Sequence, residues 1–540
     1  MANNGHDGGL SCDPGARNPA SSPGRQGVGP SSSSSADIDH LRRVAPRERI
    51  VIRAGSPGVD GPGRWDLSTG PDPADGADMD DIPMAAEDGL WLRIDRATNV
   101  LGIVSVLWTA TPVEPVALRR VLSERVVDPH PVFRHRPVLD GGWLPAGTWE
   151  EDPDFDLDRH LRVESLPPGR PDAALQERVG QLRSTPLDLS RPPWSVHLLQ
   201  GHGEGSAVVV RAHHALADGV RMIRLLLALL DPLPGASADA RPVATHGMDD
   251  VVADLLDGLR HPWRSLGAGL RLTVSALNTA LDTVEILGWV NPRTAWTGPP
   301  GRDKTAAWSE EIPLDLLAGL AHEDGATVND VCLALLGGAV ARAHESELNG
   351  PTPSNLAWMV PVNLDPLEAG PPERLGNHFA LVLVVLPLRG PFRARLAEVH
   401  ARVERIRHSW EPALTHGLQQ LIGRAPDPVA GAVSDHLANK AIGVVTNVPG
   451  PRTRMALAGA EVTGIVGWAP CSADQVLTAC IVSYAGGVRI GFGVDRCRVG
   501  DARVLVSALR EELAAVVRDH RPTHRSPATG SATTPARSTR

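Results

Sequence analysis

Two adjacent histidines, followed after three residues by an acid and a glycine, are the residues of this chain whose types and spacing best suit chemistry. The segment from His213 to Gly219 reads His-His-Ala-Leu-Ala-Asp-Gly. Histidine is the side chain best suited to accept a proton near neutral pH. Neighbouring residues on a strand point to opposite faces, so at most one of the two histidines is expected to act as a base. A structural pair of histidines at a strand end would leave the same pattern.

The elements around this segment place it where a strand passes into a helix. Apolar residues at 195–199 and 207–212 predict two strands of a hairpin, with the turn among the residues 201–205. From Val220 onwards, apolar residues recur at helical spacing. Side chains at such a junction are often presented to a cleft. The pattern also predicts a buried strand at 101–108 and helices at 116–126 and 174–182.

Composition limits the classes of function. The 540-residue chain has a formal net charge of −10, so it has no global basic field and no nucleic-acid partner is expected. Its five cysteines form no Cys-x-x-Cys pair, which favours a reduced, cytoplasmic protein without structural zinc. No apolar run reaches the length of a membrane span, so we expect a soluble or peripherally attached protein.

The chain divides into two expected lobes between two tails. Residues 1–77 and 521–540 are rich in small and polar residues and are expected to be disordered. The N-terminal lobe is expected at 78–235 and the C-terminal lobe at 302–520, joined by a helical segment at 236–301. The stretch Met248–Val290 has a helical apolar stripe that is typical of core packing, although such a stripe also suits a lipid surface.

Three further segments have structural interpretations when each is taken alone. Thr327 and Asp330 are placed to cap a helix that begins an apolar run. The segment Thr446–Pro451 reads as a turn after a strand at 442–445. The segment Gly376–Phe379 precedes a predicted strand at 380–386.

Taken together and in order, these segments resemble the bacterial wax ester synthase/diacylglycerol acyltransferase family, over about Met79 to Leu513. The heptapeptide alone also occurs in carnitine and chloramphenicol acyltransferases and in peptide-synthetase condensation domains, so the ordered set is the more specific signal. The segments that carry the resemblance are Asp88–Asp95, Thr98–Asn99, Phe133–Arg134, Phe155–Leu157 with His160, Pro186–Asp188, Arg191–Trp194, the heptapeptide, Asn329–Asp330, Met359–Val362, Gly376–Asn377, Lys440, Thr446–Pro451 and Ser483–Tyr484.

The resemblance implies an α/β fold of two similar lobes, like that of chloramphenicol acetyltransferase and other CoA-dependent acyltransferases, with a channel between them. Acyl-CoA would enter from one side and a hydroxyl acceptor from the other. The resemblance implies that His214 is the general base, with His213 in a supporting role. Asp218 would orient the loop, and Gly219 would leave room for substrate.

The resemblance also points to groups that stabilise the oxyanion of the reaction. The candidates are Asn329, Asp330, Thr446 and Asn447, because the family places their motifs near the channel. The implied reaction needs no metal and no cofactor beyond acyl-CoA, which is a substrate. The leading expectation for the acceptor is diacylglycerol, and the alternative is a long-chain fatty alcohol.

Some features depart from the family pattern or leave other functions open. The family usually has an arginine shortly after Pro361-Val362, where this chain has Asn363-Leu364-Asp365, and it often has Pro-Leu-Trp where this chain has Pro192-Pro193-Trp194. A condensation-type acyltransferase and a catalytically silent lipid-binding protein remain as less favoured alternatives. For each of these possible functions, we expect peripheral attachment to a lipid droplet or the inner membrane surface. The sequence predicts no oligomeric state.

Overall fold

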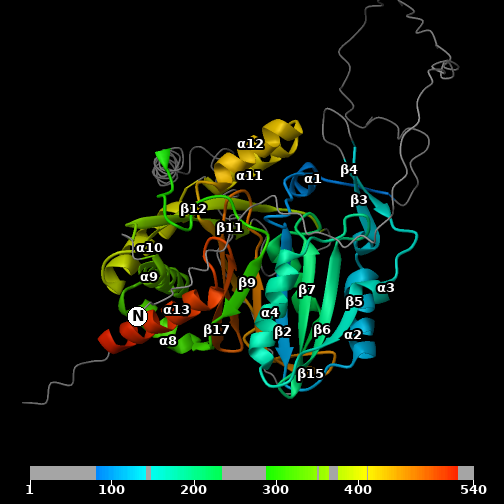
Figure 1. Cartoon of the computed structure of the whole chain (residues 1–540), viewed down its shortest axis with the longest axis horizontal. Helices are drawn as coiled ribbons and strands as arrows, with labels where there is room; N and C mark the ends of the chain where they lie inside the picture. Colours follow the sequence, from blue (N-terminus) through cyan, green and yellow to red (C-terminus); the bar gives the residue numbers. More distant parts are fainter. Residues whose placement is uncertain are drawn as a thin grey trace, which may run out of the picture. The chain divides into compact units, whose positions relative to one another are not determined.

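Two seven-stranded β-sheets form the framework of the protein (Figure 1). The computed structural model describes residues 81–140, 147–233, 288–348, 352–363, 375–409 and 411–520. All of these residues belong to one compact unit. We call the first sheet with its helices the first lobe, and the second sheet with its helices the second lobe.

The first sheet has the strand order β5-β6-β7-β2-β15-β14-β8. Antiparallel β6 and β7 form the predicted hairpin, whose turn includes Gly201 and Gly203 at positive φ. A separate small sheet has the strand order β1-β4-β3. The strands of both are β1 (Ile82–Pro83), β2 (Gly102–Thr109), β3 (His135–Leu139), β4 (Gly147–Glu151), β5 (Leu161–Ser165), β6 (Trp194–His202), β7 (Gly205–His213), β8 (Leu230–Pro232), β14 (Met455–Leu457) and β15 (Ala460–Trp468).

The second sheet has the strand order β10-β17-β16-β13-β11-β12, and β9 also pairs with β17. Strand β13 is parallel to both of its neighbours, whereas the other pairs are antiparallel. The strands are β9 (Lys304–Trp308), β10 (Ile312–Pro313), β11 (Asn355–Asn363), β12 (Phe379–Pro387), β13 (Gly443–Pro449), β16 (Leu477–Tyr484) and β17 (Gly487–Asp495).

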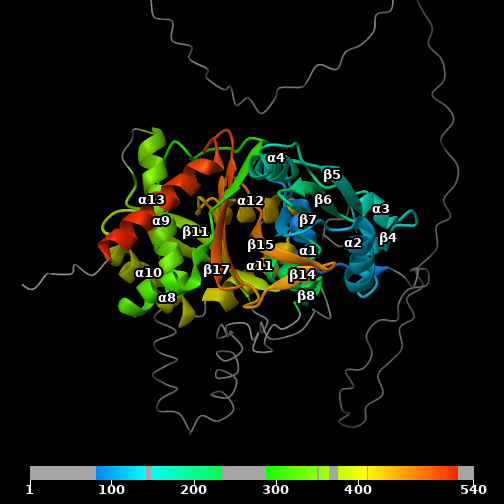
Figure 2. The ribbon, with the colours of Figure 1, turned by 90° about the horizontal axis from the view of Figure 1, so that it is seen from below.

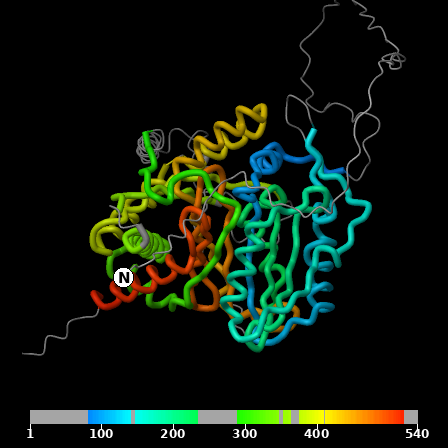
Figure 3. The backbone as a smooth tube through the Cα atoms, viewed as in Figure 1, coloured from blue at the N-terminus to red at the C-terminus, as the bar shows by residue number. Residues whose placement is uncertain are grey.

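Strands β14 and β15 lie late in the chain but pair within the first sheet, where β15 lies next to β2 (Figure 3). The hydroxyl of Tyr484, at the end of β16, donates to the Val462 carbonyl and accepts from the Met455 backbone nitrogen. The single tyrosine of the chain therefore joins these strands to the second sheet. The expected boundary at residue 302 does not separate the two sheets, because of this exchange.

Helices pack against both sheets. Figure 2 shows α8, α9, α10 and α13 gathered beside the second sheet, where they bury its main core. The other face of that sheet contributes Cys480, Val482 and Tyr484 to the core of the first lobe. The helices are α1 (Ala86–Arg93), α2 (Pro115–Leu122), α3 (Leu157–His160), α4 (Pro171–Ser184), α5 (Gly219–Ala228), α8 (Leu314–Glu323), α9 (Val328–Leu348), α10 (Phe392–Arg407), α11 (Glu411–Gly423), α12 (Asp427–Ala438) and α13 (Ala502–Asp519).

Helix α1 belongs early in the chain but is held against helices of the second lobe. The Arg93 guanidinium donates to the Gly423 carbonyl at 2.6 Å and to Asp427 at 3.0 Å. Arg96, just after α1, pairs with Asp435 at 2.7 Å. These contacts place the buried side of α1 between the two lobes, next to the end of β7.

The predicted strands and helices near the heptapeptide are confirmed, with ends that differ by a few residues. The helix expected at 116–126 is α2, which passes into a π-helical turn at Ser123–Val127. The two tails and most of Met248–Val290 lie outside the described residues. Within the described part, no single helix is long and apolar enough to cross a membrane, and only the pair Leu314–Glu323 and Val328–Ser346, bent by 95°, meets that test together.

Candidate active site

The heptapeptide joins β7 to α5 and also contacts the other lobe. Strand β7 ends at His213 and α5 begins at Gly219. Asp218, which is 1% exposed, caps the helix by accepting from the Arg221 backbone nitrogen at 2.8 Å. Its second carboxylate oxygen accepts from the backbone nitrogen of His378, in the second lobe, at 2.9 Å. The expected orienting role of Asp218 therefore has a physical basis in two bonds.

His214 packs against two aromatic side chains. Its ring centroid is 4.1 Å from that of Trp91 on α1 and 5.5 Å from that of Phe379 on β12. The side chain is only 6% exposed, and its burial, together with the nearby His213, lowers the pKa of His214 to about 3. The imidazole is consequently neutral at physiological pH and able to accept a proton.

The two ring nitrogens of His214 have different surroundings. Nδ1 is fully buried without a well-formed hydrogen bond, and so is the amide oxygen of Asn377, whose side chain favours the protonated ring. Nε2, in contrast, is not a buried nitrogen that lacks a partner. Nδ1 therefore lies towards Asn377, which leaves Nε2 as the ring nitrogen able to exchange a proton.

Asn377 connects the backbone of His214 to a buried acid. Its Nδ2 donates to the His214 carbonyl at 2.9 Å and to Asp88 Oδ1 at 2.8 Å. Burial raises the pKa of Asp88 to about 7, although the bonds from Asn377 oppose this shift. Gly376 has φ of 105°, and a Cβ atom there would lie 3.0 Å from Asp88 Oδ2. Glycine thus lets the second-lobe segment approach α1 closely.

His213 faces away from His214 and makes structural contacts. Its Nδ1 accepts from the Ala215 backbone nitrogen at 3.1 Å, which leaves the proton of the neutral ring on Nε2. That nitrogen lies 3.8 Å from Asp95 Oδ2. The other oxygen of Asp95 accepts from the Leu101 backbone nitrogen at 2.8 Å. The carbonyl of the same Leu101 accepts from the His214 backbone nitrogen. These contacts fit the supporting role expected for His213.

Asp330 has a structural environment. Thr327 and Asp330 form a reciprocal capping pair at the start of α9, with bonds of 3.0 and 3.2 Å between side chains and backbone nitrogens. The capping interpretation of these two residues is therefore confirmed. Asp330 also contacts His400 Nδ1 of α10 at 2.9 Å and is fully buried. No described contact joins it to His214.

Asn447 and Thr446, two of the remaining oxyanion candidates, lie on opposite faces of β13. Asn447 Nδ2 donates to Asn329 Oδ1 at 2.8 Å, which joins β13 to the start of α9. Thr446 points to the opposite face, since adjacent strand residues alternate. On that face Val448 packs against the first-lobe core, which includes Ala215–Ala217 of the heptapeptide. Their roles in catalysis remain predictions, and so does that of Gly219, where an added Cβ would meet no atom within 4 Å.

Sequence reasoning missed four residues that lie around His214. Asp88, Trp91 and Asn377 belong to segments that carried the family resemblance, and Phe379 follows one of them, but none was predicted as a site residue. The signal lay in Asp88-x-x-Trp91 and in Asn377-x-Phe379. Neither pattern indicates by itself that α1 and the start of β12 meet at His214.

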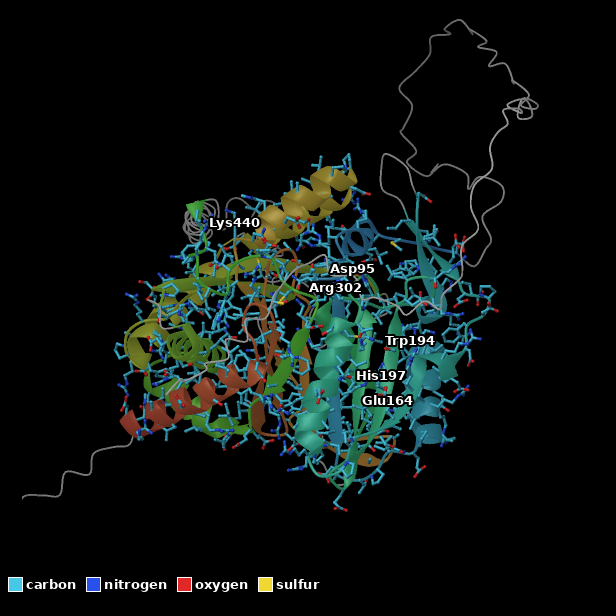
Figure 4. The ribbon with its side chains drawn as sticks, in the orientation of Figure 1. Asp95, Glu164, Trp194, His197, Arg302 and Lys440 are labelled. Atoms are coloured by element: carbon cyan, nitrogen blue, oxygen red, sulfur yellow. The ribbon has the colours of Figure 1, made fainter. Side chains whose placement is uncertain are left out.

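Other motif residues form the core of the first lobe instead of the site. His160 stacks on Trp194 with ring centroids 4.4 Å apart, and Trp194 Nε1 donates to the Phe133 carbonyl at 2.8 Å. A second polar cluster, labelled in Figure 4, joins His197 Nδ1 to Glu164 at 2.7 Å. Burial lowers the pKa of His197. Arg178 of α4 also donates to Glu164, so this cluster connects β5 and β6 to α4.

Possible metal ligands do not gather in the described part of the chain. Among those residues, no group of three or more His, Cys, Asp and Glu side chains is placed to hold a metal ion. The described cysteines are all free, and burial raises the pKa of Cys332 to about 12 and that of Cys480 to about 11. These two thiols are consequently weak nucleophiles.

The fold and site define a two-lobed acyltransferase, with the buried His214 where the lobes meet. The wax ester synthase/diacylglycerol acyltransferase catalytic domain matches residues 84–332, and the C-terminal domain of the same family matches residues 375–516. Together the two matches cover more than half of the chain. The chain belongs to the wax ester synthase/diacylglycerol acyltransferase family.

Individual relatives and solved structures agree with this assignment. A putative diacylglycerol O-acyltransferase of Mycobacterium tuberculosis is 28% identical over 474 residues, covering 81% of this chain and 91% of the relative. The wax ester synthase/diacylglycerol acyltransferase of Marinobacter aquaeolei is similar in structure with a TM-score of 0.58 at 21% identity, covering 81% of this chain and 99% of that one. The first condensation domain of the calcium-dependent antibiotic synthetase has the same fold, with a TM-score of 0.52 at 17% identity over 81% and 97% of the two chains.

Proposed function

We propose that this protein transfers a long-chain acyl group from acyl-CoA to the hydroxyl of diacylglycerol, which gives triacylglycerol and free CoA. The observation that carries the proposal is the neutral imidazole of His214, buried against Trp91 and Phe379 where the two lobes meet. The family to which the chain belongs supplies the reaction class. The relatives named diacylglycerol O-acyltransferases support the acceptor.

The proposed reaction is a direct transfer with a single base. His214 Nε2 accepts the proton of the acceptor hydroxyl while the hydroxyl oxygen attacks the thioester carbon. The tetrahedral intermediate then collapses, the carbon–sulfur bond breaks, and the departing thiolate takes the proton back from Nε2. All atoms of the substrates appear in the ester and the free thiol, so acyl-CoA is consumed as a substrate and the histidine is regenerated.

We propose Asn329 as the first candidate to stabilise the oxyanion. Because Asn447 donates to Asn329 Oδ1, the Asn329 amide nitrogen points away from that bond. Within the described residues, this nitrogen has no hydrogen-bond acceptor of its own, so it is available to donate to a developing negative charge. Thr446, on the face of β13 turned towards the first lobe, is the second candidate.

Identification of the product tests the proposed acceptor. The purified protein should convert labelled palmitoyl-CoA and diacylglycerol to labelled triacylglycerol, separated by chromatography. Formation of wax ester from hexadecanol in preference to triacylglycerol would instead support the fatty-alcohol alternative. Binding of lipid without ester formation would support a silent lipid-binding protein, and transfer only to an amine would support a condensation-type enzyme.

We also propose that the protein is cytoplasmic and attaches peripherally to a lipid surface, where such acceptors reside. Leu414, Leu418 and Leu421 are exposed at spacings of four and three residues along α11, which supports an apolar stripe on this helix. The expected stretch Met248–Val290 lies mostly outside the described residues. Flotation with phosphatidylglycerol vesicles tests the proposal, since replacing the three leucines by serine should reduce the bound fraction. Unchanged flotation would assign attachment to another segment.

A further inference from the structure

Asp88 reaches the catalytic histidine through one intermediate side chain. Its carboxylate accepts a hydrogen bond from Asn377, and the same Asn377 nitrogen donates to the carbonyl of His214. We propose that Asp88 is a positioning residue, whose carboxylate orients the Asn377 amide so that its oxygen faces the ring of His214. This inference rests on the proposed acyl transfer.

The two bonds fix the orientation of the Asn377 amide. A side-chain amide has two N–H donors on nitrogen and its acceptor on oxygen. Both donors are used, one by Asp88 Oδ1 and one by the His214 carbonyl. A reversed amide would place its oxygen against two acceptors, at a cost that burial increases. Asp88 therefore directs Asn377 Oδ1 to the remaining side, where His214 Nδ1 is also buried without a partner.

This orientation matters when the ring of His214 becomes protonated. Burial lowers the pKa of His214, whereas the Asn377 side chain acts in the opposite direction and favours the charged ring. In the transition state, Nδ1–H can donate to Asn377 Oδ1 as positive charge develops on the ring. An ionised Asp88 polarises the amide between them, because hydrogen bonds in a chain strengthen one another. A protonated Asp88 loses this effect and no longer requires one amide orientation.

The titration of Asp88 is set by groups on several elements. Burial raises the pKa of Asp88 to about 7, Glu87 acts in the same direction, and Arg221 of α5 opposes it. His378 and His416 lie near the same segment, with ring centroids 5.1 Å apart. Both histidines remain in any Asp88 variant, so an acid limb that depends on them would persist there.

The pH dependence of turnover separates a positioning role from a structural one. We expect the kcat of the wild-type protein, measured as thiol release from palmitoyl-CoA, to rise between pH 5.5 and 8.5 with a midpoint near the Asp88 titration. Asp88→Asn should be about 10- to 100-fold slower at pH 8, as expected for a slightly misplaced base. It should also lose the acid limb, with little change in KM. A variant that keeps the wild-type kcat or the wild-type limb would overturn the proposal.

Asp427→Asn is the matched control, because it removes a contact of α1 without touching the site. Asp427 on α12 pairs with Arg93 at the other end of the helix, and its side chain is largely exposed. This variant should keep both the kcat and the acid limb of the wild-type protein. An acid limb lost in both variants would show that general disturbance of α1 is responsible, and would overturn the role of Asp88.

Thermal unfolding provides a readout that does not depend on the enzymatic assay. Because the fold raises the pKa of Asp88, the folded state holds its proton more tightly than the unfolded state. This contribution to stability is full at low pH and is lost as the pH rises towards 7. The Tm of Asp88→Asn relative to wild type should therefore increase from pH 4.5 to pH 8. A constant difference would contradict the buried titrating carboxylate, whereas absent thiol release in wild type would contradict only the proposed function.

Discussion

The carboxylate of Asp218 accepts a hydrogen bond from the backbone nitrogen of His378 at 2.9 Å, although the two residues lie 160 positions apart. The same carboxylate caps α5 immediately after the two histidines. The loop that carries His214 is therefore held to the second lobe by a buried carboxylate. The contact between the two lobes and the position of His214 depend on the same side chain.

Replacement of Asp218 by alanine should lower both stability and turnover. The variant loses a helix cap and a charge-assisted bond, for an expected cost of about 2–4 kcal/mol in the free energy of unfolding. Asp218→Asn keeps an acceptor for the cap but loses the bond to His378, so its stability should be intermediate. Urea unfolding with parallel kcat measurements checks this order. An asparagine variant equal to wild type in both would show that the contact with His378 contributes little.

Replacement of Gly219 by alanine tests whether substrate uses the space beside it. An added Cβ meets no atom within 4 Å, and alanine favours the helix more than glycine does, so stability should rise by about 0.5–1 kcal/mol. If substrate occupies that space, the added methyl should raise KM by about tenfold. Thermal unfolding and steady-state kinetics on the same preparation measure both effects. An unchanged KM would remove Gly219 from the binding site.

Replacement of Asn329 by alanine tests the oxyanion assignment. Loss of one such donor is expected to lower kcat by about 10²- to 10³-fold with KM nearly unchanged. Asn447→Ala should have a smaller effect and little influence on the Tm, since it removes only the partner that orients Asn329. Stopped-assay kinetics for both variants, with Thr446→Val beside them, give the comparison. If only Thr446→Val is slow, the donor lies on the other face of β13.

Much of the local structure around the heptapeptide followed from the sequence. Two apolar runs on either side of a glycine-containing turn predicted the β6–β7 hairpin, and helical spacing after Val220 predicted α5. Thr327 and Asp330 cap α9 as their spacing indicated. Each of these features depends on residues that are close in the chain, where periodicity and capping chemistry act.

The surroundings of the base could not be predicted in the same way, because they come from distant segments. Asp88 and Asn377 lie 289 positions apart, and Asn377 and His214 lie 163 apart. Their approach depends on Gly376 at positive φ and on the contacts between α1 and the second lobe. The exchange of β15 into the first sheet has a similar origin, since no local pattern specifies a partner strand so far away.

The role of His214 is tested by thiol release from palmitoyl-CoA, measured for the purified protein and for His214→Ala with diacylglycerol, with hexadecanol and without acceptor. We expect release that depends on the acceptor and a loss of about 10²- to 10⁴-fold in the variant, the usual contribution of a general base. Circular dichroism should show that the variant remains folded. Near-normal turnover of folded His214→Ala would contradict the assignment of His214 as the base.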